Sequence, residues 1–265
     1  MKLDEGMGLV CAGGVSQSFL TRMPALLARL GPIKGASYRV SRQLSNTLRA
    51  GSPASHYSAL ECCPLIWVAV PESTLDRHLQ ELVARTPLRK APLTNTMVVL
   101  CNFDRDSAAP SPLQGTGARV ASLNLIPGLQ EKIFVAEGHN DTIRALRTLL
   151  TLDKRKLIRL EPGSKPLFFG GIHMAAPLLL PSIDAGIQCL RASGFTRAEA
   201  VQVGELLGTR TLRRYAKAGV KSWNRQAEAS LRRALEHDLT AIRARNPRLA
   251  EIYEQEIHAA LAHFA

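Results

Sequence analysis

Near its N-terminus the chain carries a short apolar run that ends in two glycines, Met7-Gly8-Leu9-Val10-Cys11-Ala12-Gly13-Gly14-Val15-Ser16. An apolar run of this length, stopped by glycine, is typical of a buried strand that leads into a tight turn. Apolar residues at helical intervals follow from Phe19 to Leu30, although Pro24 lies among them and should bend the helix. A strand, a turn and a helix in this order indicate the start of an α/β fold.

The same alternation continues through the first half of the chain. Strand candidates lie at 36–40, 65–70, 96–101, 119–123, 133–136 and 157–160, and helical patterns begin at Ser73 and Asp141. After Glu161 every pattern is helical. The sequence therefore predicts a Rossmann-like doubly wound sheet in residues 1–161 and an all-helical domain in residues 162–265, with the boundary near Pro162-Gly163.

The composition is that of a folded globular protein with a basic charge. The 265 residues carry a formal net charge of +12, which allows an acidic partner. Thirteen Lys and Arg lie between Arg191 and Arg248 against five Asp and Glu, at helical intervals that indicate a solvated face. Aromatic residues are scarce there and no nucleic-acid module is recognisable, so nucleic acid is not an expected partner.

The cysteines and the longest apolar stretch favour a cytoplasmic protein. The five cysteines are scattered and lack the paired spacing of a zinc site, so no metal is expected. Residues 166–183 contain no Lys, Arg, Asp or Glu, but glycines and prolines interrupt them, and we expect a buried helix there and no membrane span. Gly138-His139-Asn140-Asp141 favours a turn capped by Asn140 or Asp141 over a metal site.

The turn after the first strand has the position of a glycine-rich pyrophosphate loop. Against the G-x-G-x-x-G pattern, Gly13 keeps the middle glycine, Cys11 replaces the first and Ser16 replaces the third. A cysteine stands where a tight turn usually has no side chain, so the motif is damaged. The candidate cofactor-binding residues of this loop are Ala12, Gly13, Gly14, Val15 and Ser16.

The region after the second predicted strand lacks a carboxylate. No Asp or Glu occurs between Glu5 and Glu61, so the acidic residue that holds the ribose diol of NAD is missing. Ser41 and Arg42 stand there, with Arg39 close by, and positive charge with a hydroxyl suits a 2′-phosphate. NADP is therefore favoured over NAD as the cofactor. The alternative is that both arginines are ordinary surface residues near a helix start.

Several short motifs together resemble a known family. They are Ala12-Gly13-Gly14-Val15, Val40-Ser41-Arg42, Val68-Ala69-Val70-Pro71, Lys165 with Phe168, Phe169 and His173, and the run from Leu190 to Ala200. This layout resembles the Rossmann-like family whose C-terminal half is known as domain of unknown function 2520. The likeness spans nearly the whole chain, although each motif is short.

The resemblance implies a function and a partner. Its members are described as NADP-linked oxidoreductases, and their helical domain is similar to that of 6-phosphogluconate dehydrogenase and pyrroline-carboxylate reductase relatives, which pair as dimers through the helices. It implies cofactor contacts at Val70 and Pro71, a substrate cleft beside the helical domain, a small carbonyl or imine substrate, and a homodimer. Lys165, at the start of the first helix of the second domain, would face that cleft as a general acid or base.

His173 follows Lys165 by eight residues and could share its helix face. The alternatives are a surface lysine beside Pro162-Gly163 and a histidine held in the helix core. Some positions depart from the family, because Phe168-Phe169 stands where Tyr-His is common and Ser122-Leu123-Asn124-Leu125 where Ser-x-His-Pro is common. The second hypothesis is therefore a non-catalytic, degenerate Rossmann-like binding or scaffold protein.

Overall fold

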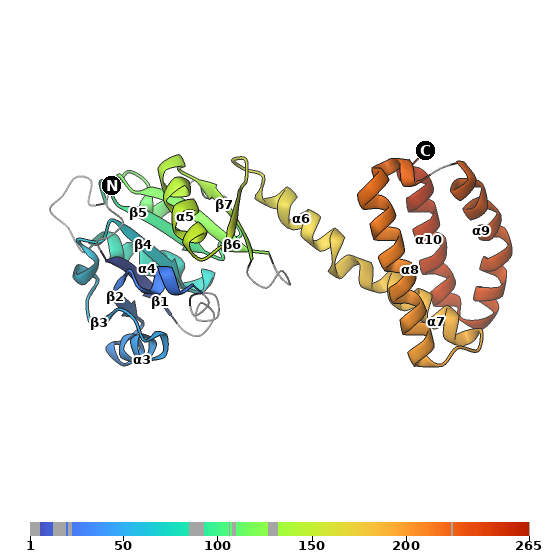
Figure 1. Ribbon diagram of the computed structural model, residues 1–265, viewed down its shortest axis with the longest axis horizontal. Coiled ribbons are helices and arrows are strands. Elements are labelled where there is room, and N and C mark those ends of the chain that lie inside the picture. The colour runs from blue at the N-terminus through green and yellow to red at the C-terminus, as the bar shows by residue number, and fades with distance from the viewer. Residues whose placement is uncertain are drawn as a thin grey trace. The chain divides into compact units, whose positions relative to one another are not determined.

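The computed structural model describes residues 6–12, 20, 23–84, 93–105, 107, 110–126, 132–223 and 225–264. Internal contacts divide the chain into two compact units, Met1–Gly170 and Gly171–Ala265 (Figure 1). The division falls inside helix α6 (Lys165–Ala175), whereas the sequence placed the domain boundary in the loop at Pro162-Gly163.

The first unit is built on a single sheet of eight strands. These are β1 (Met7–Cys11), β2 (Leu30–Gly35), β3 (Ser52–Ala54), β4 (Leu65–Ala69), β5 (Met97–Cys101), β6 (Arg119–Leu125), β7 (Ile133–Gly138) and β8 (Lys156–Arg159). Their order is β3-β2-β1-β4-β5-β6-β7-β8, parallel from β3 to β6, with β7 antiparallel to β6 and β8 parallel to β7. The predicted α/β doubly wound fold is confirmed, and so is the helical region that follows it.

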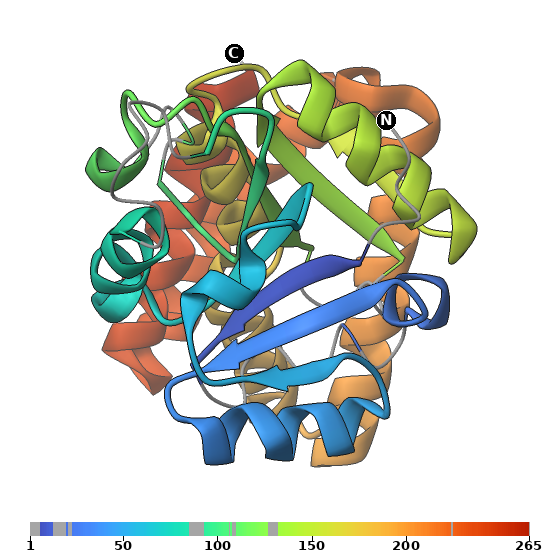
Figure 2. The ribbon, with the colours of Figure 1, turned by 90° about the vertical axis from the view of Figure 1, so that its left-hand side faces the viewer.

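Helices cover both faces of this sheet. One face packs on α2 (Pro24–Leu27), α3 (Tyr38–Leu48) and α5 (Asn140–Leu152), and the other on α4 (Glu72–Ala84) and the short 3₁₀ helices η2 (Tyr57–Leu60) and η3 (Ser111–Leu113). Figure 2 shows α4 and α5 on opposite sides of the strands. Because β4 lies between the layers, all five of its residues are buried, as expected of a continuous apolar strand in a parallel sheet.

The second strand lies earlier than the sequence predicted. β2 spans Leu30–Gly35, and the predicted strand at 36–40 is instead the entry into α3, whose N-cap is Ser37. The Ser37 hydroxyl accepts a hydrogen bond from the Val40 backbone N–H at 3.3 Å, which is the usual way to begin a helix. The helix cap at Ser37 therefore decides the local structure against the strand preference of the β-branched Val40. The first residues of α3 follow closely after β2.

Two smaller predictions are also corrected. Pro24 does not bend a longer helix, because it is the first residue of α2, where its missing N–H costs nothing. The cap of α5 is His139 and neither of the residues predicted for it, since the His139 ring accepts a hydrogen bond from the Asp141 N–H at 3.2 Å. Gly138-His139-Asn140-Asp141 is thus a turn and a helix start.

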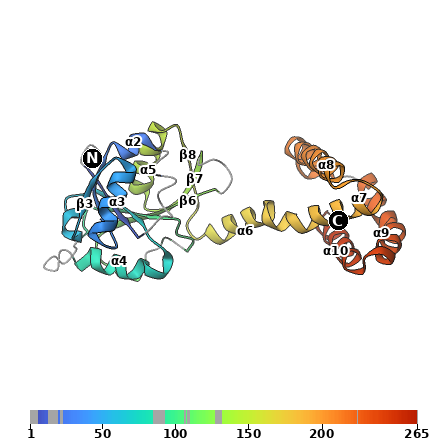
Figure 3. The ribbon, with the colours of Figure 1, turned by 90° about the horizontal axis from the view of Figure 1, so that it is seen from below.

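The second unit is helical throughout the residues described. It contains the end of α6, then η4 (Pro177–Leu179), α7 (Leu180–Ala192), α8 (Arg197–Ala218), η5 (Gly219–Ser222), α9 (Arg225–Arg245) and α10 (Pro247–Phe264). α7 packs on α8 and α10, and α9 packs on α10, as Figures 1 and 3 show. A reciprocal capping box between Thr196 and Glu199 fixes the start of α8.

The apolar stretch of residues 166–183 is not a buried helix within this chain. Leu167 is 80 % exposed and Leu180 is 62 % exposed. Among the described residues, Lys165–Ala192 is long and apolar enough to cross a membrane by length and composition, and none of its apolar window is buried. η4 and the proline Pro181 interrupt the stretch. Each unit, taken by itself, therefore leaves these apolar side chains uncovered.

Candidate functional site

The strand order reverses between β1 and β4, and three strand ends meet at this point. Cys11, the last residue of β1, pairs with Gly35 at the end of β2 and with Ala69 at the end of β4. In open parallel sheets, ligands bind in the crevice outside the carboxyl ends of the strands where the order reverses. The topology therefore marks this edge as the candidate site.

Three predicted cofactor-binding residues leave the sheet at this edge. Ala12 follows β1, and Val70 and Pro71 follow β4, with Pro71 exposed and the other two half-buried. Gly13, Gly14, Val15 and Ser16 lie outside the described residues. Because Cys11 pairs with Ala69, the residues that follow them, Ala12 and Val70, leave the sheet side by side.

Cys11 belongs to the strand and to the core. Its side chain is 1 % exposed and lies in the same apolar cluster as Cys101 at the end of β5. Burial, and secondarily the neighbouring Cys11, raise the pKa of the Cys101 thiol, so this thiol stays protonated. The cysteine at the first glycine position therefore packs beneath the edge of the sheet as an apolar residue.

The N-terminal turns of α3 present positive charge beside the end of β2. Ser37, Arg39 and Arg42 are all exposed there, and Tyr38 is 51 % exposed. Unpaired backbone N–H groups at a helix N-terminus attract anions, and arginines add charge and paired donors. Ser37 was missed by the sequence reasoning, which placed this segment in a strand and so overlooked a cap residue three positions before Val40.

Ser41 has a different environment from the one expected. It is 0 % exposed, and its hydroxyl accepts from the Gly35 N–H at 2.8 Å and lies 3.0 Å from the Ala54 carbonyl, to which it can donate. A Cβ on Gly35 would come within 2.8 Å of the Ser41 nitrogen, so strand and helix are in close contact. The expected contact of this hydroxyl with a cofactor phosphate is replaced by a link between β2, β3 and α3.

This assignment gives a stability prediction. Ser41→Ala leaves the buried Gly35 N–H and Ala54 carbonyl without their partner, and we expect the free energy of unfolding to fall by about 1–3 kcal/mol. Urea titration followed by circular dichroism measures it. Thr47→Ala, on the exposed side of the same helix, should change stability by less than about 0.5 kcal/mol. A stable Ser41→Ala protein with weakened binding of a 2′-phosphate would reverse the assignment.

Lys165 is the first residue of α6 and is 1 % exposed. Its ammonium donates to the backbone carbonyls of Phe103 and Arg105, both at 2.6 Å, and lies 4.9 Å from the centroid of the Phe103 ring. Both carbonyls belong to the segment that follows β5, so the ammonium lies beside the carboxyl edge of the sheet. A buried charge needs such partners, because an isolated one is very costly.

His173 does not share the buried position of Lys165. It is exposed in the last turn of α6, and it belongs to the second unit, whereas Lys165 belongs to the first. The alternative of a histidine held in a helix core is not what the structure has.

Two buried polar side chains lie near the start of α6, and the sequence did not predict either as a site residue. On β6, Asn124 is 4 % exposed, and its side-chain Nδ2 donates to the Asp104 carboxylate at 3.1 Å. On β7, Glu137 is 1 % exposed, and its Oε1 accepts from the Gly163 N–H at 2.7 Å. The amide oxygen of Asn124 (Oδ1) and the other carboxylate oxygen of Glu137 (Oε2) have no hydrogen-bond partner among the described residues.

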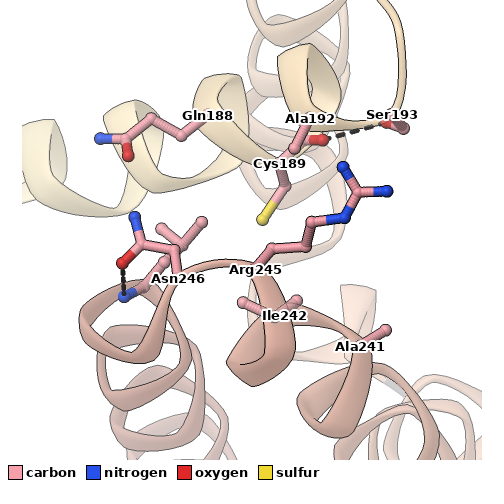
Figure 4. A pocket seen from close by; sticks show the side chains of 9 residues that line it. Gln188, Cys189, Ala192, Ser193, Ala241, Ile242, Arg245 and Asn246 are labelled. Carbon is pink, nitrogen blue, oxygen red and sulfur yellow. Dashed lines mark hydrogen bonds between the residues drawn. The ribbon is translucent and has the colours of Figure 1, made fainter.

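The helical unit has a cavity of its own, of about 470 Å³. Figure 4 shows it between α7 and the turn that joins α9 to α10, with Gln188 and Cys189 on one side and Arg245 and Asn246 on the other. Burial raises the pKa of the Cys189 thiol, which keeps the nucleophilic thiolate scarce. None of the predicted site residues that the structure describes lines this cavity.

Comparison with known proteins adds a fold relationship. No family model matches the sequence, and no curated protein sequence matches it, but many solved structures do. A Bacteroides fragilis protein provisionally named an NADP oxidoreductase is 11% identical, with a TM-score of 0.73 over 98% of this chain and 99% of its own. The label of domain of unknown function 2520 is not supported by a family match.

Two further similar structures were solved with their cofactor. An imine reductase from Myxococcus stipitatus in complex with NADP⁺ is 14% identical, with a TM-score of 0.64 over 97% of this chain and 94% of its own. A reductive aminase from Aspergillus terreus in complex with NADPH and ethyl levulinate is 11% identical, with a TM-score of 0.61 over 98% of this chain and 94% of its own. At such identities the likeness establishes the shared fold, and function has to be argued from the residues.

Proposed function

We propose that this protein is an NADP-dependent oxidoreductase that acts on a small imine or carbonyl substrate. The observation that carries the proposal is the edge where β1, β2 and β4 end level with one another, at the point where the strand order reverses. The solved structures of the same fold include an imine reductase with NADP⁺ and a reductive aminase with NADPH, which supports a nicotinamide cofactor and a carbon–nitrogen bond as the reacting group.

The residues at the start of α3 fit a phosphorylated ribose. Arg39 and Arg42 are exposed there, and the segment between Glu5 and Glu61 holds no carboxylate that would repel a phosphate. Guanidinium groups match the planar array of phosphate oxygens and can bind it through paired hydrogen bonds. Ser37, at the helix N-terminus, offers a hydroxyl beside them. We therefore propose NADP over NAD, with Ala12 to Ser16, Val70 and Pro71 along the rest of the cofactor.

The proposed chemistry divides between cofactor and protein. When bound, NADPH would supply the hydride for the carbon of the C=N or C=O group. Lys165 gives a proton from its ammonium to the nitrogen or oxygen, and solvent returns a proton to the amine. The carbonyls of Phe103 and Arg105 hold the ammonium in one place throughout, which is what a proton donor requires. We propose no part for His173 in this step, because it is exposed in the other unit.

The cofactor preference can be tested by titration. We expect thermal shifts with NADPH and NADP⁺ that exceed those with NADH and NAD⁺, since a ligand of the folded state raises its stability. The double variant Arg39→Ala/Arg42→Ala should weaken NADPH binding by roughly 10- to 100-fold, at about 1.5–3 kcal/mol for lost charged hydrogen bonds, and leave NADH binding unchanged. Arg147→Ala, an exposed arginine of α5, serves as the matched control. Equal loss for both cofactors would contradict the assignment.

We also propose that two copies of the chain pair through the helical unit. The exposed large apolar residues of η4, α7 and α8 include Leu178, Leu180, Ile183, Leu206 and Leu212, each at least half exposed. Monomers rarely keep so large an apolar surface in water, and interfaces of stable homodimers resemble a domain core cut in half. A homodimer in the cytoplasm would cover these side chains.

The alternative hypothesis predicts a different set of results. A non-catalytic Rossmann-like binding or scaffold protein would give no thermal shift with any of the four nicotinamide cofactors at near-millimolar concentration. Turnover of an imine with NADPH would exclude it.

A further inference from the structure

Glu137 holds the segment that leads into α6. It lies on β7, paired with Ser122 of β6, which in turn pairs with Leu100, the last residue but one of β5. Its Oε1 accepts the Gly163 N–H at 2.7 Å from a backbone with φ +77°, a left-handed conformation that suits glycine. Gly163 is two residues before Lys165. A buried carboxylate therefore fixes the turn from which the lysine starts.

The side-chain nitrogen of Lys165 is held by a different segment, the one that follows β5. Its Nζ donates to the carbonyls of Phe103 and Arg105, and Asp104 between them accepts from Asn124 of β6. The backbone at the start of α6 is thus tied to β7, and the ammonium is tied to the segment after β5. The position of the nitrogen depends on both ends, because a long flexible side chain is held in place only when its backbone is held as well.

The fold alone does not explain a charged residue at position 137. Glu137 is 1 % exposed, one of its oxygens has a single backbone donor, and the other has no hydrogen-bond partner among the described residues. Burying a carboxylate with so few donors is unfavourable, and well-packed apolar residues often serve stability better. Costly buried polar groups are expected where function requires them.

We infer that Glu137 is a positioning residue for Lys165, which it acts on through the Gly163 turn. This inference rests on the proposed function, in which Lys165 donates the proton. Its hydrogen-bond acceptor matters more than its charge, because the contact that the structure contains is one hydrogen bond to a neutral N–H.

Two conservative variants separate the hydrogen bond from the charge. Glu137→Gln keeps an acceptor at the same reach and removes the charge, whereas Glu137→Asp keeps the charge and is one methylene too short to reach Gly163. We expect Glu137→Asp to lower kcat for NADPH-dependent imine reduction by roughly 10- to 100-fold, with KM and NADPH affinity unchanged, and Glu137→Gln to stay within about 3-fold of the native enzyme. Glu161→Ala, an exposed carboxylate of the same loop, is the matched control and should leave kcat unchanged.

A second readout does not depend on turnover. Amide hydrogen exchange at Gly163 and the nitrogen-15 signal of the Lys165 ammonium, measured on the full chain without substrate, report the turn and the lysine directly. We expect both to change in Glu137→Asp and both to stay native in Glu137→Gln. An unaltered lysine signal in Glu137→Asp would overturn the positioning role, whether or not the protein turns over an imine. If Glu137→Asp has the kcat of the native enzyme, the positioning role of Glu137 is wrong while the proposed oxidoreductase function still holds.

Discussion

Replacing Lys165 with glutamine should reduce kcat for NADPH-dependent reduction of an imine by about 100- to 10,000-fold, the usual contribution of a positioned proton donor. Glutamine keeps a polar N–H₂ group in the buried position, one methylene short of the lysine nitrogen, and it has no ionisable proton to transfer. NADPH affinity should stay within about 3-fold, since the lost interaction acts mainly on the transition state. Stopped-flow and steady-state assays with a panel of cyclic imines measure both quantities.

The size of the effect follows from the surroundings of the lysine. An exposed lysine exchanges its partners with water, whereas Lys165 is 1 % exposed with two carbonyls at 2.6 Å. Lys165→Ala would leave both carbonyls without this donor and could unfold the site, so glutamine is the cleaner test. Lys156→Gln, an exposed lysine of β8, is the control and should leave kcat unchanged. Undiminished turnover in Lys165→Gln would remove the proposed proton donor and leave cofactor binding as a separate question.

The order of strands and helices could be predicted because the apolar pattern of a buried parallel sheet is strong. β4 and β5 are continuous apolar runs, and the structure finds them within one residue of the predicted bounds. The error at β2 has a local cause. That strand contains Gly31, Pro32 and Lys34, so its pattern is weak, while Val40 in α3 imitates a strand residue. A cap such as Ser37 is the signal that separates the two.

The candidate site was predictable only in part, since sequence shows residue types and not partners. The missing acidic residue after the second strand could be seen at once, and it directed attention to Arg39 and Arg42. The same reasoning selected Ser41, whose hydroxyl the fold uses between strand and helix. Position along the chain could not distinguish the solvent-facing Arg42 from the buried Ser41 next to it.

Glu137 escaped prediction for a related reason. In Ile133–Gly138 it occupies an alternate position of an ordinary strand pattern, where a charged residue normally faces water. The loop between β8 and α6 reaches this buried side chain and supplies the Gly163 N–H to its carboxylate. Contacts of this kind join residues 26 positions apart and have no local signature.

The apolar stretch before and within α7 was expected to form a buried helix, but the helices of its own unit do not bury it. The sequence pattern shows that these side chains avoid water, and it does not show whether the same chain, a second copy or a membrane covers them. Leu178, Leu180 and Ile183 are 61 %, 62 % and 50 % exposed, so the helices of their own unit do not cover them. A second copy is therefore the covering surface that we propose.

Leu180→Glu/Ile183→Glu is expected to convert a homodimer into a monomer. Each buried Leu or Ile side chain contributes about 1.5–3 kcal/mol, and a two-fold interface removes each contact twice, so the dissociation constant should rise by at least about 1,000-fold. Light scattering coupled to size-exclusion chromatography at micromolar protein measures the mass. Both side chains are exposed in the single chain, so their replacement should leave the helical content seen by circular dichroism unchanged.

A matched substitution elsewhere distinguishes an interface from a general loss of apolar surface. Leu152 is 50 % exposed, like Ile183, but it lies at the end of α5 in the first unit, so Leu152→Glu should remain dimeric. A native chain that is monomeric at every concentration would contradict the homodimer. If the native chain instead co-sediments with phosphatidylcholine vesicles and the double variant does not, the covering surface is a lipid. The break in the stretch favours the protein partner, because η4 separates α6 from α7, whereas a bilayer favours one continuous helix.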